Sequence, residues 1–418
     1  MRILLLASTQ SYRTDDFAQA AQKLGVEAVL GTNRCHELAG LWPSEAFGSV
    51  EIPFRDEERA TARVVELARA TPLDAIVPTD DATAEIAARA CAQLGLPGNS
   101  IAAAVTARNK RRMREALQAA GVPCPDFRVF EEGDDPERVA RQVEYPCVMK
   151  PLLCSASRGV IRADDEASFV AAWRRLTALL QMPALRAVED PDGHRILVER
   201  FVPGAEVALE GLLLRGRLQV LALFDKPDPL DGPFFEETIY LTPSRHPAEL
   251  QARIAEATQA AAAAIGLVEG PVHAELRLPH TAPYVSVLEV AARSIGGLCS
   301  RTLRFGLSGA SLEELVIRQA LGQPLGELAR SGAAGVMMLP IERGGVLQAV
   351  DGVDEARSVP LIEDVQVTAK IGQVLEPLPE GASYLGFVFA RGARPEEVEA
   401  ALRQAHARLR FTVAPKLN

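Results

Sequence analysis

Two glutamates on apolar strands form the combination in this sequence that best predicts chemistry. Glu275 lies in a Val-His-Ala-Glu-Leu-Arg run, and Glu289 follows fourteen residues later in a Val-Leu-Glu-Val-Ala run. If residues 279–284 form a turn, the two strands are a hairpin and the carboxylates lie close together. Like charges at that distance repel unless they share a cation, and carboxylate oxygens suit Mg²⁺ bound jointly with nucleotide phosphates. Arg293 would add positive charge near a phosphoryl group in transfer.

His273 stands two residues before Glu275 and has two interpretations. It orients a substrate or supports Glu275 through a hydrogen bond, or it is a hydrogen-bonded histidine of the core. The sequence favours neither.

A lysine followed by a loop of small residues indicates a phosphate site. Lys150 ends an apolar strand, where a buried ammonium is costly unless an anion pairs with it. Residues 152–159, Leu-Leu-Cys-Ser-Ala-Ser-Arg-Gly, can fold over phosphates with backbone N–H groups and hydroxyls, including that of Ser157. Each of these features alone is more often structural.

The strand expected at 196–202 suits a purine pocket. Glu199 precedes an aromatic residue and a Pro-Gly turn, so backbone groups could bind the adenine edge while a carboxylate binds ribose hydroxyls. The alternative is an ordinary strand and turn with a solvated glutamate.

The elements that must position these residues alternate between strands and helices. Residues 1–98 predict a small α/β layer with a mainly parallel sheet. A helical region at 102–120 leads into a strand-rich α+β part that extends to residue 330 and closes with a helix at 306–321. From residue 331, three strands and a helix form a last α+β unit. We therefore expect three domains, 1–98, 99–330 and 331–418.

Composition excludes several classes of protein. Of the 418 residues, 48% are hydrophobic and 24% charged, which rules out disorder. The net charge of −10 argues against general nucleic-acid binding. No 18-residue apolar run predicts a membrane span, and the run at 3–7 is too short for a signal peptide. The six cysteines lack Cys-x-x-Cys spacing, so we expect free thiols and no structural zinc site. From these features together we expect a cytoplasmic protein without a nucleic-acid or membrane partner.

Taken together, the motifs resemble the ATP-grasp superfamily. They are Asn-Lys at 109–110, Val-Met-Lys-Pro at 148–151, Val-Glu-Arg-Phe-Val-Pro-Gly at 198–204, His-Ala-Glu at 273–275 and Leu-Glu-Val-Ala-Ala-Arg at 288–293. The order and spacing match over about residues 1–320. The segments at 335–340 and 383–388 are similar to the C-terminal domain of L-amino-acid ligases.

The resemblance implies a role for each matched residue and an ATP-grasp core of two α+β subdomains. Mg²⁺, with Mn²⁺ as a substitute, is the implied metal. The implied roles are phosphate contact for Lys110, Lys150 and the Ser157 loop, adenine contact for Glu199 and Val202, ribose contact for Glu206, phosphate or substrate contact for Lys226, metal binding for Glu275 and Glu289, and stabilisation of an acyl-phosphate and its tetrahedral successor for Arg293.

The sequence departs from the family pattern in two motifs, the metal motif and the phosphate loop. Ala291 stands where many members have asparagine, so one oxygen ligand for the metal is missing. Cys154 and Ala156 occupy places in the phosphate loop that usually hold glycine. Cys154 lies close to ATP, or it is a small filler.

The implied function is an ADP-forming carboxylate–amine ligase that uses ATP and small carboxylate and amine substrates, and a homodimer is compatible with it. One alternative is a carboxylase of the biotin-carboxylase or purine-biosynthetic kind, against which the C-terminal resemblance argues. A second is a non-catalytic ATP-binding module. Ala291 favours that alternative mildly, whereas Glu275, Glu289 and Arg293 argue against it.

Overall fold

The N-terminal layer is a parallel sheet, as the sequence predicts. The computed structural model describes residues 1–8, 11–33, 48–186, 190–280 and 284–416. The strands run in the order β3-β2-β1-β4, and all three pairings are parallel. β3 was not predicted. The layer consists of β1 (Arg2–Leu6), α1 (Thr14–Lys23), β2 (Glu27–Thr32), β3 (Gly48–Glu51), α3 (Glu57–Ala70), β4 (Ala75–Pro78) and α4 (Asp81–Leu94).

The helical region predicted at 102–120 is confirmed, and Asn109 divides it into two helices. α5 (Ile101–Arg108) ends at Asn109, and α6 (Lys110–Ala119) begins there. The Asn109 side chain accepts a hydrogen bond from the Arg112 N–H and donates one to Asp192 at 2.7 Å. An asparagine cap satisfies a free N–H at a helix start, so the break places Lys110 at the head of a new helix.

A small antiparallel sheet follows, in the order β5-β8-β6-β7. α8 packs on one face through Phe169, Trp173 and Leu176, which are buried against Met149 and Val198 of the sheet. The elements are β5 (Phe127–Glu131), α7 (Pro136–Ala140), β6 (Cys147–Pro151), β7 (Ile161–Ala163), α8 (Glu166–Leu180), α9 (Pro183–Arg186), a 3₁₀ turn at Pro191–His194 and β8 (Arg195–Arg200).

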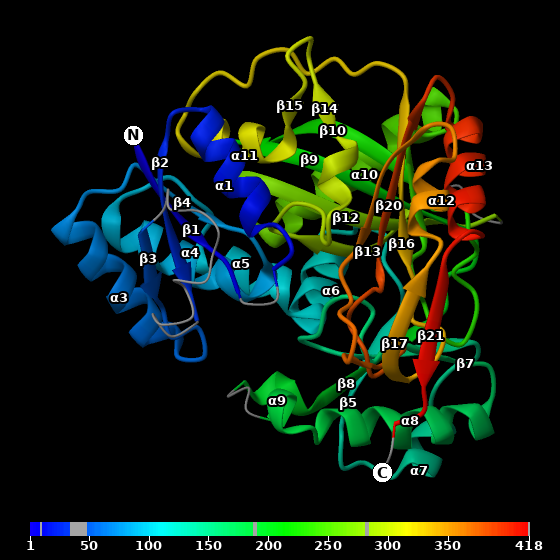
Figure 1. The fold of residues 1–418 in the computed structure, drawn as a ribbon. Helices are drawn as coiled ribbons and strands as arrows, with labels where there is room; N and C mark the ends of the chain where they lie inside the picture. Colours follow the sequence, from blue (N-terminus) through cyan, green and yellow to red (C-terminus); the bar gives the residue numbers. More distant parts are fainter. Residues whose placement is uncertain (9–10, 34–47, 187–189, 281–283, 417–418) are drawn as a thin grey trace.

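A large antiparallel sheet of eight strands runs through the rest of the chain, in the order β13-β12-β9-β10-β11-β16-β20-β18 (Figure 1). Its first five strands precede residue 330, and its last three follow it. β11 pairs with β16, with Tyr240 opposite Val336. The C-terminal part therefore continues this sheet, and the domain boundary at 330 stays a prediction. The strands are β9 (Ala205–Leu214), β10 (Arg217–Asp225), β11 (Ile239–Thr242), β12 (Gly270–Leu278), β13 (Ser286–Ala291), β16 (Ala333–Leu339), β18 (Ile362–Val367) and β20 (Gly386–Gly392).

The helix expected at 306–321 is present only from Leu312 to Ala320, so the first part of the prediction is wrong. A short hairpin of β14 (Arg304–Phe305) and β15 (Ala310–Ser311) takes its first residues, and α11 (Leu312–Ala320) begins after Ser311, whose side chain forms a capping box with Glu314. The other elements are α10 (Ala248–Ile265), a 3₁₀ turn at Cys299–Thr302, β17 (Gly345–Asp351), α12 (Val353–Arg357), β19 (Val374–Leu375), α13 (Pro395–His406) and β21 (Arg410–Ala414).

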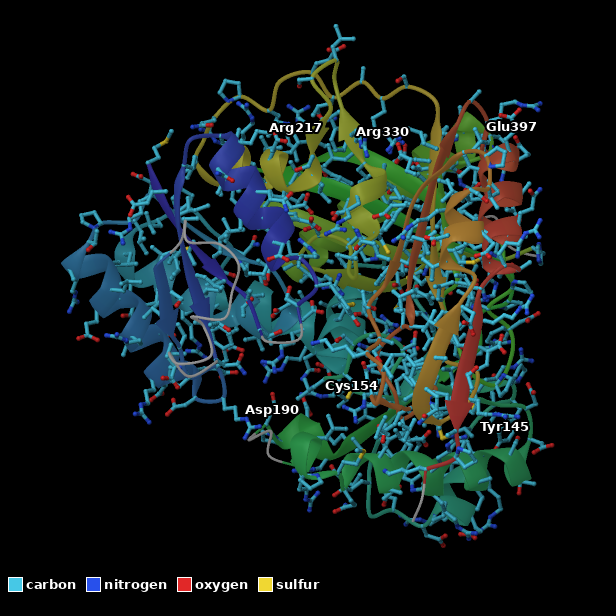
Figure 2. The ribbon with its side chains drawn as sticks, in the orientation of Figure 1. Tyr145, Cys154, Asp190, Arg217, Arg330 and Glu397 are labelled. Carbon is cyan, nitrogen blue, oxygen red and sulfur yellow. The ribbon has the colours of Figure 1, made fainter. Side chains whose placement is uncertain are left out.

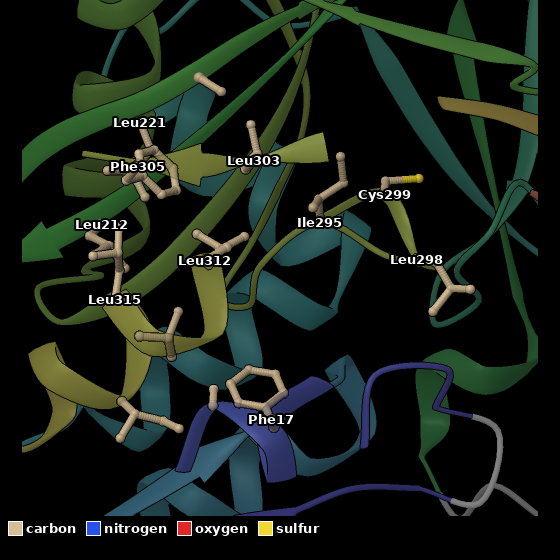
Figure 3. Packing of buried hydrophobic residues seen from close by; sticks show 14 of the residues in the cluster. Phe17, Leu212, Leu221, Ile295, Leu298, Cys299, Leu303, Phe305, Leu312 and Leu315 are labelled. Atoms are coloured by element: carbon tan, nitrogen blue, oxygen red, sulfur yellow. The ribbon is translucent and has the colours of Figure 1, made fainter. Parts of the chain in front are cut away.

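One hydrophobic cluster joins the N-terminal layer to the large sheet. Phe17 of α1 packs in the same cluster as Leu315 of α11 and Leu212 and Leu221 of the sheet, all buried (Figure 3). Shared burial of this kind holds two layers in a fixed relation, and the functional residues lie between them. Among the helices in the described part of the chain, none has the length and apolar character to cross a lipid bilayer.

Candidate active site

A cavity of about 390 Å³ lies where the N-terminal layer, the small sheet and the large sheet meet. That volume is within the range of small-molecule sites. All the site residues predicted from the sequence except Lys226 line it. Lys226 lies directly behind the lining, 2.7 Å from a carboxylate oxygen of Glu206. Five separate segments of the chain therefore bring the predicted residues together at one cavity.

A buried ion triad lies where β6 and β8 contribute to the cavity wall. Glu199 of β8 contacts the Lys150 ammonium of β6 at 2.6 Å and the Arg114 guanidinium of α6 at 2.6 Å. Burial alone would raise the pKa of Glu199, but the two cations outweigh it and lower that pKa below its usual value. Val202 lines the cavity just after β8 ends at Arg200.

Arg114 is a site residue that the sequence interpretation missed. It is fully buried, and it also donates a hydrogen bond to the Leu288 carbonyl of β13 at 2.6 Å. Its position four residues after Lys110 on one helix was the available signal, because residues at that spacing share a helix face.

The phosphate loop between β6 and β7 is fastened to Lys110. The Lys110 ammonium donates to the Cys154 carbonyl at 2.8 Å and lies 3.2 Å from Glu289. Burial lowers the pKa of Lys110, but Glu289 more than compensates, so the net shift is upward. Cys154, labelled in Figure 2 between α6 and the small-sheet layer, lines the cavity together with Ser157. Burial raises the pKa of the Cys154 thiol, although Lys110 and Arg158 oppose that shift.

The predicted hairpin of glutamates is present, since Glu275 of β12 stands directly opposite Glu289 of β13 in an antiparallel pairing. The side chains contact different cations. Glu289 faces Lys110, whereas Glu275 lies 3.7 Å from Lys226 and 3.7 Å from His273. Burial would raise the pKa of Glu275, but Lys226 and His273 lower it strongly.

A third and a fourth carboxylate border Glu275. Oxygens of Glu206, Glu237 and Glu275 lie within 4.8 Å of one another, and Lys226 contacts Glu206 and Glu237. Tyr240 donates a hydrogen bond to Glu237 at 2.8 Å. The sequence interpretation missed Glu237, because it lies in a loop without a recognisable motif. Such a set of hard oxygen donors fits a divalent cation bound with phosphates.

His273 combines features of both its sequence interpretations. It is buried and contacts Glu210 at 3.1 Å, yet it lines the cavity beside Glu275. Burial lowers the pKa of His273, and the two glutamates outweigh this effect and raise it. Glu210 also accepts the Ile295 N–H at 3.0 Å, so His273 is tied to the loop that follows β13.

Arg293 is held by an acid from the N-terminal layer. Its Nε donates to Asp81 Oδ2 at 2.9 Å. Burial lowers the pKa of Arg293 but Asp81 reverses the shift, and Arg293 in turn holds the pKa of Asp81 below its usual value against the effect of burial. Asp81 was missed as a site residue. The signal was its place in a polar loop after a buried parallel strand, where ligands of open α/β sheets commonly bind.

The remaining wall of the cavity is largely apolar and aromatic. It comes from the N-terminal layer, the loops around residues 230–240 and 295–299, and the C-terminal part. The residues concerned include Tyr12, Phe235, Tyr240, Ile295, Cys299, Met338 and Tyr384. Cys35 and residues 281–283 of the expected turn lie outside the described residues.

Comparison with known proteins identifies the parts of the chain. The model of the ATP-grasp domain matches residues 143–302, that of the ATP-grasp N-terminal domain matches 18–98, and that of the L-amino acid ligase C-terminal domain 2 matches 337–414. A crystal structure of L-amino acid ligase from Bacillus licheniformis is similar with a TM-score of 0.84 and 28% identity, covering 99% of this chain and 98% of that one.

Two curated relatives are longer than this chain. Alanine–anticapsin ligase of Bacillus subtilis (strain 168) is 26% identical over 72% of this chain and 66% of its own length. Carnosine synthase 1 of Gallus gallus is 32% identical over 74% of this chain and 35% of its own length. The chain thus spans just under two-thirds of the first and about a third of the second. The chain therefore carries an ATP-grasp domain, preceded by an ATP-grasp N-terminal domain and followed by a C-terminal domain of the L-amino acid ligase type.

Proposed function

We propose that this protein is an ADP-forming ligase that joins the carboxylate of one small molecule to the amine of another. A carboxylate oxygen attacks the γ-phosphorus of ATP, the bond to the β-phosphate oxygen breaks, and ADP leaves. The amine then attacks the acyl carbon, gives up a proton, and inorganic phosphate leaves with its bonding electrons. The product is an amide, a peptide bond when both substrates are amino acids.

The observation that carries this proposal is the set of charged residues that line one cavity. Lys110, Lys150, Glu275, Glu289 and Arg293 all line this cavity, together with the apolar and aromatic wall. Phosphoryl transfer needs positioning and charge stabilisation more than it needs a covalent group from the protein. These charges, together with the apolar and aromatic wall, fit the binding of ATP beside a small organic substrate.

The chain's own residues supply most of the binding. Lys110, Lys150 and the Ser157 loop hold phosphates, while Glu199 and Val202 border the adenine and Glu206 the ribose. Glu275 and Glu289 would hold Mg²⁺, which when bound neutralises charge on the phosphates. The ammonium of Lys226 lies among three carboxylates in the free protein, and we propose that it turns to phosphate or substrate when the site fills.

Arg293 is the residue we assign to the chemical step. Asp81 fixes its guanidinium by a hydrogen bond at 2.9 Å, so the cation is oriented before the substrate arrives. A preorganised charge costs no reorganisation when negative charge develops on the transferring group. The apolar and aromatic wall would limit the access of water to the acyl-phosphate.

The test is release of ADP from ATP and Mg²⁺ in the presence of single amino acids, pairs of amino acids, or bicarbonate. A ligase releases one ADP for each amide formed and is fastest with a pair. Release that depends on bicarbonate would indicate the carboxylase instead. ATP binding without release under any of these conditions, over a full panel of pairs, would indicate the non-catalytic module.

A further inference from the structure

The phosphate loop is fastened at its far end by the C-terminal part of the chain. The Gly159 N–H donates to the Pro379 carbonyl at 2.8 Å, and Arg158 Nε donates to the Glu380 carbonyl at 2.9 Å. These bonds cross more than two hundred residues of sequence. In Figure 1 the C-terminal strands β17 and β21 reach down to the small-sheet layer.

A phosphate loop of this composition needs an external hold. Ala156 and Ser157 adopt φ angles of 55° and 54°, which is a left-handed conformation that costs energy for a residue with a β-carbon. Glycine would adopt it without that cost. Contacts from outside the loop must therefore offset the strain and keep the loop in this shape.

Glu380 supplies a second contact, from its side chain. Both of its carboxylate oxygens accept from Arg175 of α8, at 2.6 and 2.7 Å. The hydrogen bonds to Arg175 lower the pKa of Glu380. Two-point pairs of this kind fix orientation as well as distance. The turn that presents Glu380 is tight, because a β-carbon on Gly381 would lie 1.8 Å from the Glu376 carbonyl oxygen.

We infer that Glu380 is a positioning residue for ATP, which acts by clamping the phosphate loop and α8 to the C-terminal part. The inference rests on the nucleotide-binding half of the proposed function. The same segment continues into Ala382 and Tyr384, which line the cavity. The clamp therefore connects the wall of the substrate end to the phosphates.

Charge reversal of the Arg175–Glu380 pair tests the clamp. The variants are Arg175→Glu, Glu380→Arg and the double reversal. Each single reversal places like charges opposite each other, whereas the double reversal restores an ion pair. We expect each single variant to bind the ATP analogue AMP-PNP with Mg²⁺ about fivefold more weakly by calorimetry, and the double variant to recover to within about twofold of wild type.

Arg174→Glu is the matched control. Arg174 is adjacent to Arg175 on α8 and pairs with Glu137 inside the small-sheet layer. Its reversal changes the net charge by the same amount as Arg175→Glu but leaves the contact to Glu380 in place. We expect its AMP-PNP affinity to stay within about twofold of wild type. Adenosine, which has no phosphates, should bind all four variants equally in a competition assay.

Hydrogen exchange in the free protein gives a readout that needs no nucleotide. The single reversals should speed exchange of the Gly159 N–H about fivefold, and the double reversal should restore protection. Unchanged affinity and exchange in the single variants, no recovery in the double variant, or an equal loss in Arg174→Glu would overturn the inference. A wild-type protein that binds no AMP-PNP overturns the proposed function itself.

Discussion

At the scale of single residues, Arg293 gives the sharpest test of the chemical step. Arg293→Met keeps most of the side-chain length and removes the cation. Because the charge acts on the transition state, we expect turnover to fall about 10²–10³-fold. AMP-PNP affinity should stay near that of wild type, as calorimetry would measure. Wild-type turnover with true substrates would exclude the role.

The same substitution has a structural cost that the sequence did not indicate. It leaves the partly buried Asp81 carboxylate without its partner, so the melting temperature should fall. Adding Asp81→Asn removes the unpaired charge and should restore part of the stability without restoring turnover. This double variant separates a folding defect from a catalytic one.

Glu289→Gln tests metal binding by a different readout. The amide keeps the shape of the side chain but removes one charged ligand, so more Mg²⁺ should be needed for half-maximal activity. Titration of Mn²⁺ in the presence of AMP-PNP, followed by electron paramagnetic resonance, should give an affinity about tenfold weaker. An unchanged Mn²⁺ affinity would mean that Glu275 and its neighbours Glu206 and Glu237 hold the metal without Glu289.

The lowered pKa of Glu199 predicts how the free energy of unfolding depends on pH. Its pKa is lowered in the folded protein by Arg114 and Lys150 against the effect of burial. A lowered folded pKa gives stability that is fully present above the unfolded pKa, near 4.3, and is lost as pH falls through the folded value. The free energy of unfolding of wild type should therefore decline with acid below about pH 4.5 more steeply than that of Glu199→Gln, in urea titrations. Parallel declines would contradict this.

Residues with a motif were predictable, and their partners were not. Glu275 and Glu289 stood out because strand alternation and hairpin spacing bring such positions together. Asp81, Arg114 and Glu237 reach the site from three other elements, and only the tertiary arrangement makes them neighbours. Nothing in the linear sequence indicates that these three residues lie close to the site in the folded protein.

At the scale of elements, the break at Asn109 positions the phosphate lysine. Asn109→Ala removes the helix cap and the bond to Asp192. Loss of such a cap costs about 1 kcal/mol, and Asp192 loses one hydrogen bond while it keeps its ion pairs with Arg111 and Arg195. We expect a lower melting temperature and a higher KM for ATP with little change in kcat. An equal effect of Ser100→Ala, which caps α5 instead, would show that the KM change is a general stability effect.

Most strands with an apolar run were predicted, including β16, β17 and β20 of the C-terminal part. The strands that were missed include β3, β11, β18, β19 and β21. β11 has four residues and ends before a proline, so its apolar run is too short to indicate a strand. The segment at 306–321 misled for a local reason, because its helix signal starts only at Ser311, and the preceding Gly306 and Gly309 adopt positive φ angles in a turn. The parallel N-terminal sheet was predictable because buried parallel strands alternate with amphipathic helices.

At the scale of the molecule, a chain truncated after Arg330 tests the predicted domain boundary at residue 330. Truncation removes β16 and leaves β11 with an unpaired edge, and it also removes the Pro379 and Glu380 carbonyls that hold the phosphate loop. We expect thermal unfolding to lose its cooperativity and AMP-PNP binding to be lost. A truncated chain that unfolds cooperatively and binds AMP-PNP normally would establish that residues 1–330 fold without the C-terminal part.

The crossing from β11 to β16 also has a consequence for how the protein is made. Tyr240 leaves the ribosome roughly a hundred residues before its partner Val336, and synthesis at about 5–20 residues per second makes that delay roughly 5–20 s. Isolated hairpins form in microseconds, so β9 and β10 pair long before the strand that covers β11 exists. For those seconds the nascent chain exposes an apolar strand edge. Slower translation lengthens this interval, so rare codons between residues 243 and 333 should lower the yield of folded protein more than rare codons after residue 392.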